Sequence, residues 1–176
     1  QVLWIWTGDG LAAAQAAPVL RLYALGNGFL VMSAFPYYLQ FAKGDLRLHL
    51  FGNLLFLFFL IPSLVWAAWK HGALGAGYAW LLSNLIYFSI WVPFVHKKFA
   101  KGLNRQWLIN DLGWVVASST LVAGILFFSV RWSPDRIVAL ACMTFLGVLL
   151  FVASASASHS ARRLFVRIWT KQNWDK

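Results

Sequence analysis

The sequence predicts an all-α membrane protein, a bundle of about five helices that cross a bilayer. Hydrophobic residues make up 61% of the chain and charged residues only 11%, whereas soluble domains contain about 25% charged residues. Five apolar stretches each reach the roughly 20 residues that a helix needs to cross the hydrocarbon layer. Lipid cannot satisfy free backbone polar groups, so we expect these stretches to be helices. The alternating strands of an outer-membrane barrel are not apparent.

The predicted spans follow one another with short polar connections. We place them at residues 18–42, 48–69, 73–95, 112–130 and 137–158. Pro18 suits the start of the first helix, and Pro134 lies in the break between the last two. Several tryptophans lie near predicted span ends, as in the aromatic belts of membrane proteins: Trp66, Trp69, Trp91, Trp107 and Trp132.

The chain divides into three parts on this interpretation. Residues 1–16 are expected to hold the end of a preceding helix and a periplasmic loop, so the chain is expected to be the C-terminal part of a longer protein. Residues 17–160 form the five-helix transmembrane region. Residues 161–176 form a basic cytoplasmic tail, expected to lie on the inner leaflet as an amphipathic helix.

The basic residues are sorted between alternate connections. Eleven of the 15 Lys and Arg residues lie in the first connection, the third connection or the tail. The positive-inside rule therefore places those segments and the C-terminus in the cytoplasm. The net charge of +10 does not indicate nucleic-acid binding, because the basic residues flank apolar runs and form no polar domain. Cationic loops facing an anionic leaflet explain them better.

No catalytic or metal-binding pattern stands out. The chain has no Glu and five scattered Asp residues, so the paired carboxylates of a hydrolase are hard to assemble. The four histidines lie at span ends, where solvated imidazoles are expected, and Cys142 is expected to be a buried small side chain. We therefore expect no enzyme activity, no cofactor and no metal. The small residues from Ser154 onwards are expected to serve helix packing.

Polar side chains inside apolar helices are the remaining candidates for function, because burying them in hydrocarbon is costly. Arg21 either faces a cavity as a cation for a phosphate or extends to the membrane surface. Asn27, Gln40 and Asn53 either contact a substrate or bond neighbouring helices. Prolines within three predicted helices are expected to kink them: Pro36, Pro62 and Pro93.

Several runs resemble bacterial polysaccharide flippases, the Wzx-type O-antigen transporters of the multidrug/oligosaccharidyl-lipid/polysaccharide exporter superfamily. The residues that carry the resemblance are LGNG at 25–28, FPYYLQ at 35–40, AKGDLRL at 42–48, GALGAGY at 72–78 and, less strongly, WIWTG at 4–8. The resemblance extends to about residue 111, and the last two spans match only in general character.

The resemblance implies a two-lobed bundle around a cationic cavity, of which this chain is most of the C-terminal lobe and a missing N-terminal lobe is the partner. The implied substrate is an undecaprenyl-diphosphate-linked oligosaccharide, moved across the bacterial inner membrane during O-antigen and lipopolysaccharide synthesis by alternating access. Arg21, Lys43 and Arg47 would meet the diphosphate. The sugar would contact five side chains: Asn27, Tyr37, Tyr38, Gln40 and Asn53.

Three other functions stay open at this point. A drug or small-cation exporter of the related multidrug type shares the fold, but cation binding requires carboxylates. Another alternative is a non-enzymatic membrane subunit of polysaccharide export or a degenerate fragment. A membrane-embedded glycosyltransferase or polymerase is disfavoured, because such enzymes need a large periplasmic loop or a carboxylate base, and the longest connection, residues 96–105, is predicted to be cytoplasmic.

Overall fold

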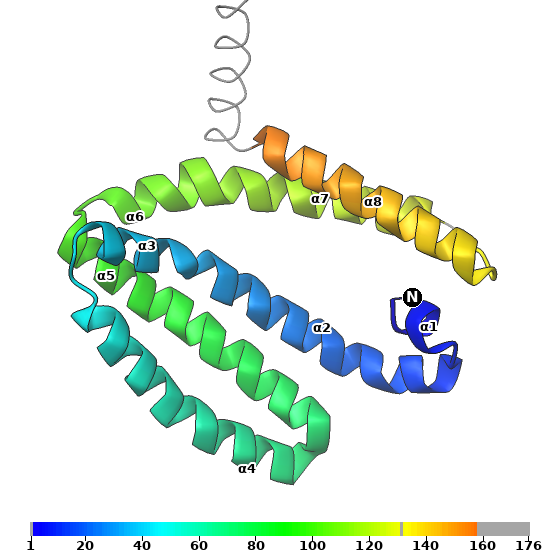
Figure 1. The fold of residues 1–176 in the computed structure, drawn as a ribbon, viewed down its shortest axis with the longest axis horizontal. Coiled ribbons are helices and arrows are strands. Elements are labelled where there is room, and N and C mark those ends of the chain that lie inside the picture. The colour runs from blue at the N-terminus through cyan, green and yellow to red at the C-terminus, as the bar shows by residue number, and fades with distance from the viewer. Residues whose placement is uncertain (1, 131, 158–176) are drawn as a thin grey trace, which may run out of the picture. The chain divides into compact units, whose positions relative to one another are not determined.

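The computed structural model describes residues 2–130 and 132–157, and these residues are almost entirely helical (Figure 1). In chain order the elements are α1 (Val2–Thr7), α2 (Gly10–Met32), α3 (Ala34–Ala42), α4 (Arg47–Ile86), the π-helix η1 (Tyr87–Trp91), α5 (Val92–Phe99), α6 (Leu103–Gln106), the π-helix η2 (Trp107–Gly113), α7 (Trp114–Ser129) and α8 (Arg136–Ala157).

Four helical stretches of the described residues are long and apolar enough to cross a membrane: Gly10–Ala42, Arg47–Phe99, Leu103–Ser129 and Arg136–Ala157. The second has 53 residues, but its chain reverses direction at Gly72, where the backbone leaves the helical region with φ 60° and ψ −149°. Its two arms, residues 47–71 and 73–99, contain the second and third predicted spans. The predicted fold class is confirmed: the chain is an all-α, multi-pass membrane helix bundle.

The first long helix begins earlier than Pro18. Asp9 caps α2, because its Oδ1 accepts hydrogen bonds from the backbone N–H groups of Leu11 at 2.8 Å and Ala12 at 3.1 Å. Such a carboxylate satisfies N–H groups that the helix itself leaves free. Pro18 therefore lies inside the helix, and the expected helix start at that residue is wrong.

The chain divides into two compact units that meet between Asn104 and Arg105. In the second unit along the chain, α7 and α8 pack together, and the hydroxyls of Ser119 and Ser154 share a hydrogen bond of 2.7 Å. Ser154 thus has the packing role expected of it, and the predicted tail at 161–176 lies outside the described residues. Cys142 is exposed on α8, so the expectation of a buried thiol is wrong.

The first unit along the chain, Val2–Asn104, is built from α2 with α3 and the two arms of residues 47–99 (Figure 1). Glycines bring these helices close together. A Cβ on Gly26 would lie 2.5 Å from Trp80 Cδ1, and one on Gly77 would lie 3.0 Å from Leu22 Cδ1. Small residues at such crossings allow the close helix contacts that stabilise membrane bundles.

Two of the three prolines that were expected to kink helices coincide with irregular helix geometry. Helices α2 and α3 meet at Ser33, three residues before Pro36, and η1 directly precedes the turn that contains Pro93. Proline lacks the N–H that the carbonyl four residues earlier would accept, and its ring crowds that carbonyl, so the helix kinks or widens there. The helix continues through Pro62.

The tryptophans divide into two groups. Trp66 and Trp69, near the reversal at Gly72, are 61% and 79% exposed, as expected of a belt at the membrane surface. Trp91 instead packs on Gly52, where an added Cβ would meet its ring, and Trp107 is buried. The belt interpretation is therefore wrong for Trp91 and Trp107, because their rings fill space between or beside helices.

Candidate functional site

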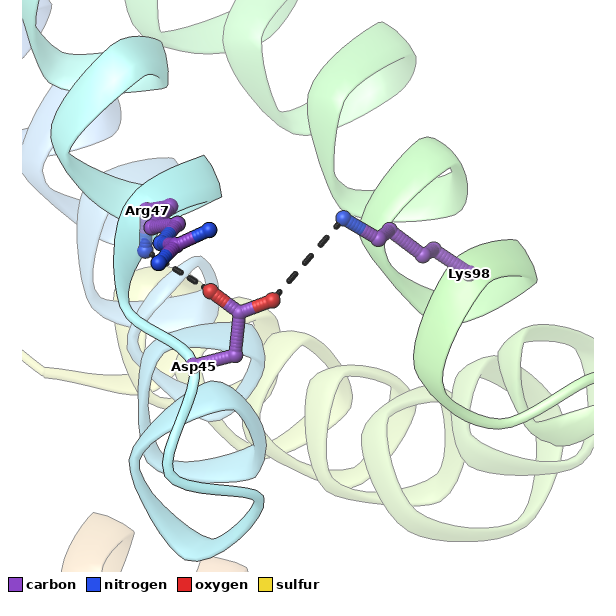
Figure 2. A network of polar contacts seen from close by, with 3 residues as sticks. All are labelled: Asp45, Arg47 and Lys98. Carbon is purple, nitrogen blue, oxygen red and sulfur yellow. Dashed lines mark hydrogen bonds and ion pairs between the residues drawn. The ribbon is translucent and has the colours of Figure 1, made fainter.

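Cationic side chains gather at one end of the first unit, where α3 joins α4 and where α5 ends. Asp45 Oδ1 accepts a hydrogen bond of 3.1 Å from the backbone N–H of Arg47, and its Oδ2 lies 4.0 Å from Lys98 Nζ (Figure 2). Both members of the ion pair are partly exposed, at 51% for Lys98 and 38% for Asp45, so the pair stabilises the fold by about 1 kcal/mol at most. We call this region the basic end, defined by Lys43, Asp45, Arg47, Lys97, Lys98 and Lys101.

The basic end carries an excess of positive charge. It holds five cations and a single carboxylate among its six defining residues. Lys43, Arg47 and Lys97 are exposed and have no ion pair within the described residues. A surface with this balance attracts anions, and the planar guanidinium of Arg47 matches a phosphate with two parallel hydrogen bonds.

An aromatic and polar group lies beside these cations. The ring of Tyr37 on α3 lies 4.6 Å from the ring of His49 on α4 and 5.2 Å from that of Tyr38. One helical turn further on, Asn53 Nδ2 donates a hydrogen bond of 3.1 Å to His49 Nε2. Tyr38 is 64% exposed. These side chains offer ring faces together with hydroxyl, imidazole and amide groups, the combination that recognises polar ligands with apolar faces.

His49 is the member of this group that the sequence analysis missed as a site residue. The signal was present, because His49 and Asn53 are four residues apart and so share one face of a helix. Tyr37 comes from the preceding helix and reaches His49 only because residues 43–46 turn the chain back. The spacing of residues within one helix does not predict such contacts between two helices.

Two polar side chains near the basic end are buried. Gln40 is 1% exposed, and its Nε2 donates to the carbonyl of Pro36 at 3.0 Å. Gln40 is therefore not part of the exposed surface of the basic end, and its predicted contact with the sugar stays a prediction. His96 is fully buried, and its Nδ1 donates to Asn104 Oδ1 at 2.7 Å. The expectation of a solvated imidazole at this span end is wrong for His96.

Asn27 connects two helices. Its Oδ1 accepts a hydrogen bond of 3.1 Å from Trp80 Nε1, and the ring of Trp80 stacks on Tyr23 with centroids 6.0 Å apart. Of the two interpretations of Asn27, the structure favours the bond between neighbouring helices over the substrate contact.

Arg21 lies within α2 and away from the basic end, next to Leu22, which packs on Gly77 near the reversal of the chain. It is exposed on α2 and has no hydrogen bond or ion pair within residues 2–130 and 132–157. Lys43 follows it by 22 residues, which corresponds to about 33 Å along a helix. The structure thus brings Tyr37, Tyr38, Lys43, Arg47 and Asn53 to one end and leaves Arg21 and Asn27 away from it.

The described carboxylates mostly serve helix ends. Asp9 caps α2, and Asp135 Oδ1 accepts from the N–H of Ile137 at 2.8 Å at the start of α8. Asp45 belongs to the basic end, and Asp111 is half-buried within η2. No group of three or more His, Cys, Asp or Glu side chains able to hold a metal occurs in the part of the chain that the structure describes.

Fold and site together define a class: a multi-pass α-helical membrane protein with an exposed cationic and aromatic surface at one end of a helical unit. Comparison with protein-family models, curated proteins and solved structures finds no match.

Proposed function

We propose that this chain belongs to a transporter that moves an undecaprenyl-diphosphate-linked oligosaccharide across the bacterial inner membrane for the synthesis of surface polysaccharide. The observation that carries the proposal is the basic end, where exposed Lys43 and Arg47 lie beside Tyr37, Tyr38 and Asn53. A sugar diphosphate requires both halves of this surface, cations for its phosphates and ring and amide groups for its sugar.

The orientation of the proposed transporter follows from charge. The basic end and the predicted basic tail face the cytoplasm under the positive-inside rule. The lipid-linked oligosaccharide is then bound from the leaflet in which it is made. The C-terminus is cytoplasmic in the same arrangement.

The separation of the cations suits a transporter with two access states. Arg21 on α2 and Lys43 at the end of α3 are 22 residues apart, which corresponds to about 33 Å measured along the two helices and is close to the roughly 30 Å thickness of the hydrocarbon layer. One diphosphate cannot contact both residues at once. We propose that it binds Lys43 and Arg47 when the site opens to the cytoplasm, and Arg21 after the lobes have changed to the outward-open state.

Asp111 supports a second candidate, a drug or small-cation exporter. Of the four described carboxylates, Asp111 is the one that neither caps a helix nor joins an ion pair, and it lies within the apolar stretch Leu103–Ser129. A carboxylate at such a position is a site for a cation. The substitution Asp111→Asn distinguishes the two candidate functions. It should abolish export of a cation, but it should leave the rate of transport of an anionic lipid within about twofold of the wild-type rate.

Deletion of the gene in its native host tests the proposal. We expect surface polysaccharide to disappear from gels of cell-envelope extracts, and lipid-linked repeat units to accumulate in the membrane fraction. A plasmid copy of the intact gene should reverse both effects. Unchanged surface polysaccharide and no accumulated lipid-linked repeat in the deletion strain would exclude this function.

A further inference from the structure

A groove lies between the two arms of residues 47–99, within the first unit. It has a volume of about 470 Å³. Gly52, Phe56 and Ser63 line it from the first arm, and Ser83, Tyr87 and Trp91 from the second. Its wall is mainly aliphatic and aromatic, with the hydroxyls of two serines and one tyrosine as its side-chain oxygens.

The packing of Trp91 and the π-helix shape this groove. Trp91 lies on Gly52, where an added Cβ would meet the indole ring. The rings of Tyr87 and Trp91 stack with centroids 6.2 Å apart, and the ring of Phe56 meets Tyr87 edge-on at 5.2 Å. The wider turn of η1 ends just before Pro93 and brings both rings to the groove. Short π-helical segments within α-helices occur frequently at functional sites.

The depth of the groove shows which part of a lipid it would meet. Gly52 follows Arg47 by five residues and Ser63 follows it by 16, which corresponds to about 8 Å and 24 Å along the helix. The groove therefore starts about one and a half turns inside the basic end and runs through the depth occupied by lipid chains. Its apolar wall excludes a sugar or a free phosphate.

We infer that this groove holds the polyprenyl chain of the lipid carrier while the phosphate of the same molecule binds at the basic end. The inference deepens the proposed function and rests on it. The carrier of the proposed substrate has both parts, an anionic group for Lys43 and Arg47 and a long hydrocarbon chain for the aromatic wall. Burial of that chain against Phe56, Tyr87 and Trp91 supplies affinity that does not depend on the sugar.

Photolabelling tests the inference on the purified full-length protein. The probe is a polyprenyl phosphate that carries a diazirine in its chain and no sugar. Peptide mass spectrometry should find the label in residues 52–63 and 83–91. The substitution Ser83→Phe fills the groove and should lower that labelling about tenfold. Ser89→Phe is the matched control, because Ser89 belongs to the same arm, residues 73–99, is exposed and does not line the groove.

Three outcomes would overturn the inference: label outside the groove, labelling unchanged in both Ser83→Phe and Ser63→Phe, or equal labelling by a diacyl phosphatidic acid with the same diazirine. The second groove variant covers a failure of Ser83→Phe to fold. Groove labelling in a protein whose deletion leaves surface polysaccharide intact would sustain this inference and reject the proposed transport. Loss of surface polysaccharide in the deletion strain without labelling of the groove would support the proposed transport and reject this inference.

Discussion

Replacing Gly75 by alanine is expected to destabilise the helical hairpin of residues 47–99. An added Cβ at Gly75 would meet the backbone carbonyl oxygen of Ala67 and lie 2.8 Å from His71 Cβ. The carbonyl belongs to a helix and cannot move aside, so the two arms must separate. Overpacking of this kind costs about 1–3 kcal/mol or more. Thermal unfolding of the purified protein in detergent should show a melting temperature several degrees lower, or the protein should fail to accumulate in the membrane.

Gly28→Ala is the control for this prediction. Gly28 lies in α2, and an added Cβ there has nothing within 4 Å. Alanine is the better helix former by about 1 kcal/mol, so this variant should be as stable as the wild type or more so. Equal melting temperatures for Gly75→Ala and the wild type would show that the arms do not pack as closely at the turn as described.

Removal of the two exposed cations that begin the basic end is expected to have the largest effect on transport. The charge-assisted hydrogen bonds that Lys43 and Arg47 would give a diphosphate are each worth about 1.5–3 kcal/mol. Lys43→Gln combined with Arg47→Gln should therefore lower the rate of transport more than tenfold. Arg47→Lys should recover only part of the loss, because an ammonium cannot form the two parallel bonds of a guanidinium. The rate is measured as surface polysaccharide made after induction of the gene in the deletion strain.

Lys70→Gln is the matched control. Lys70 is also exposed, but it lies next to the turn at Gly72, with its Nζ 5.1 Å from the ring centroid of Trp69. Loss of the Lys70 charge should leave the rate of transport within about twofold of the wild-type rate. Protein levels and the side of the membrane on which the C-terminus lies must match in all variants, because loop cations also orient the chain. Equal rates of transport in the double variant and the wild type would exclude the basic end from the transport path. The rate of the Arg21→Ala variant would then show whether Arg21 contributes.

The helices were predictable because lipid restricts the choice of structure. Each of the five apolar stretches overlaps a long described helix, since no other structure satisfies the backbone in hydrocarbon. The ends were less predictable. The cap at Asp9 depends on one local hydrogen-bonding geometry, and the first helix consequently starts eight residues before Pro18. The break between the second and third predicted spans includes Gly72, and the chain reverses there because φ near +60° with ψ near −150° is available almost solely to glycine.

Only part of the candidate site was predicted, because its residues come from several helices whose contacts the sequence pattern does not reveal. Lys43 and Arg47 were visible as a charged break between apolar runs. The contact between Tyr37 and His49, the burial of Gln40 and the bond from Trp80 to Asn27 depend on which faces of different helices meet. Hydrophobic period gives no such information where nearly every helix face is apolar. The same limit concealed the groove, whose Trp91 had the position of a membrane-belt residue.

Part of the resemblance to polysaccharide flippases falls on residues that shape the fold. Gly26 receives Trp80, Gly75 receives the Ala67 carbonyl and Gly77 receives Leu22. Helix packing alone accounts for glycine at these positions, without any contact to a substrate. Residues 35–48 are different, because they form α3 and the start of the basic end. In the proposed transporter, recognition of a lipid-linked oligosaccharide would therefore depend on this second group.

Reconstitution of the purified full-length protein into vesicles would measure the proposed transport itself. The vesicles would carry a fluorescent undecaprenyl-diphosphate oligosaccharide in both leaflets, and a membrane-impermeant quencher added outside would report the fraction that becomes accessible. With the protein present, we expect quenching to pass beyond the outer-leaflet half towards completion, and to stop near half in vesicles that contain the Lys43→Gln, Arg47→Gln variant. Quenching that stops near half with correctly inserted wild-type protein, as in protein-free vesicles, would contradict the proposed function.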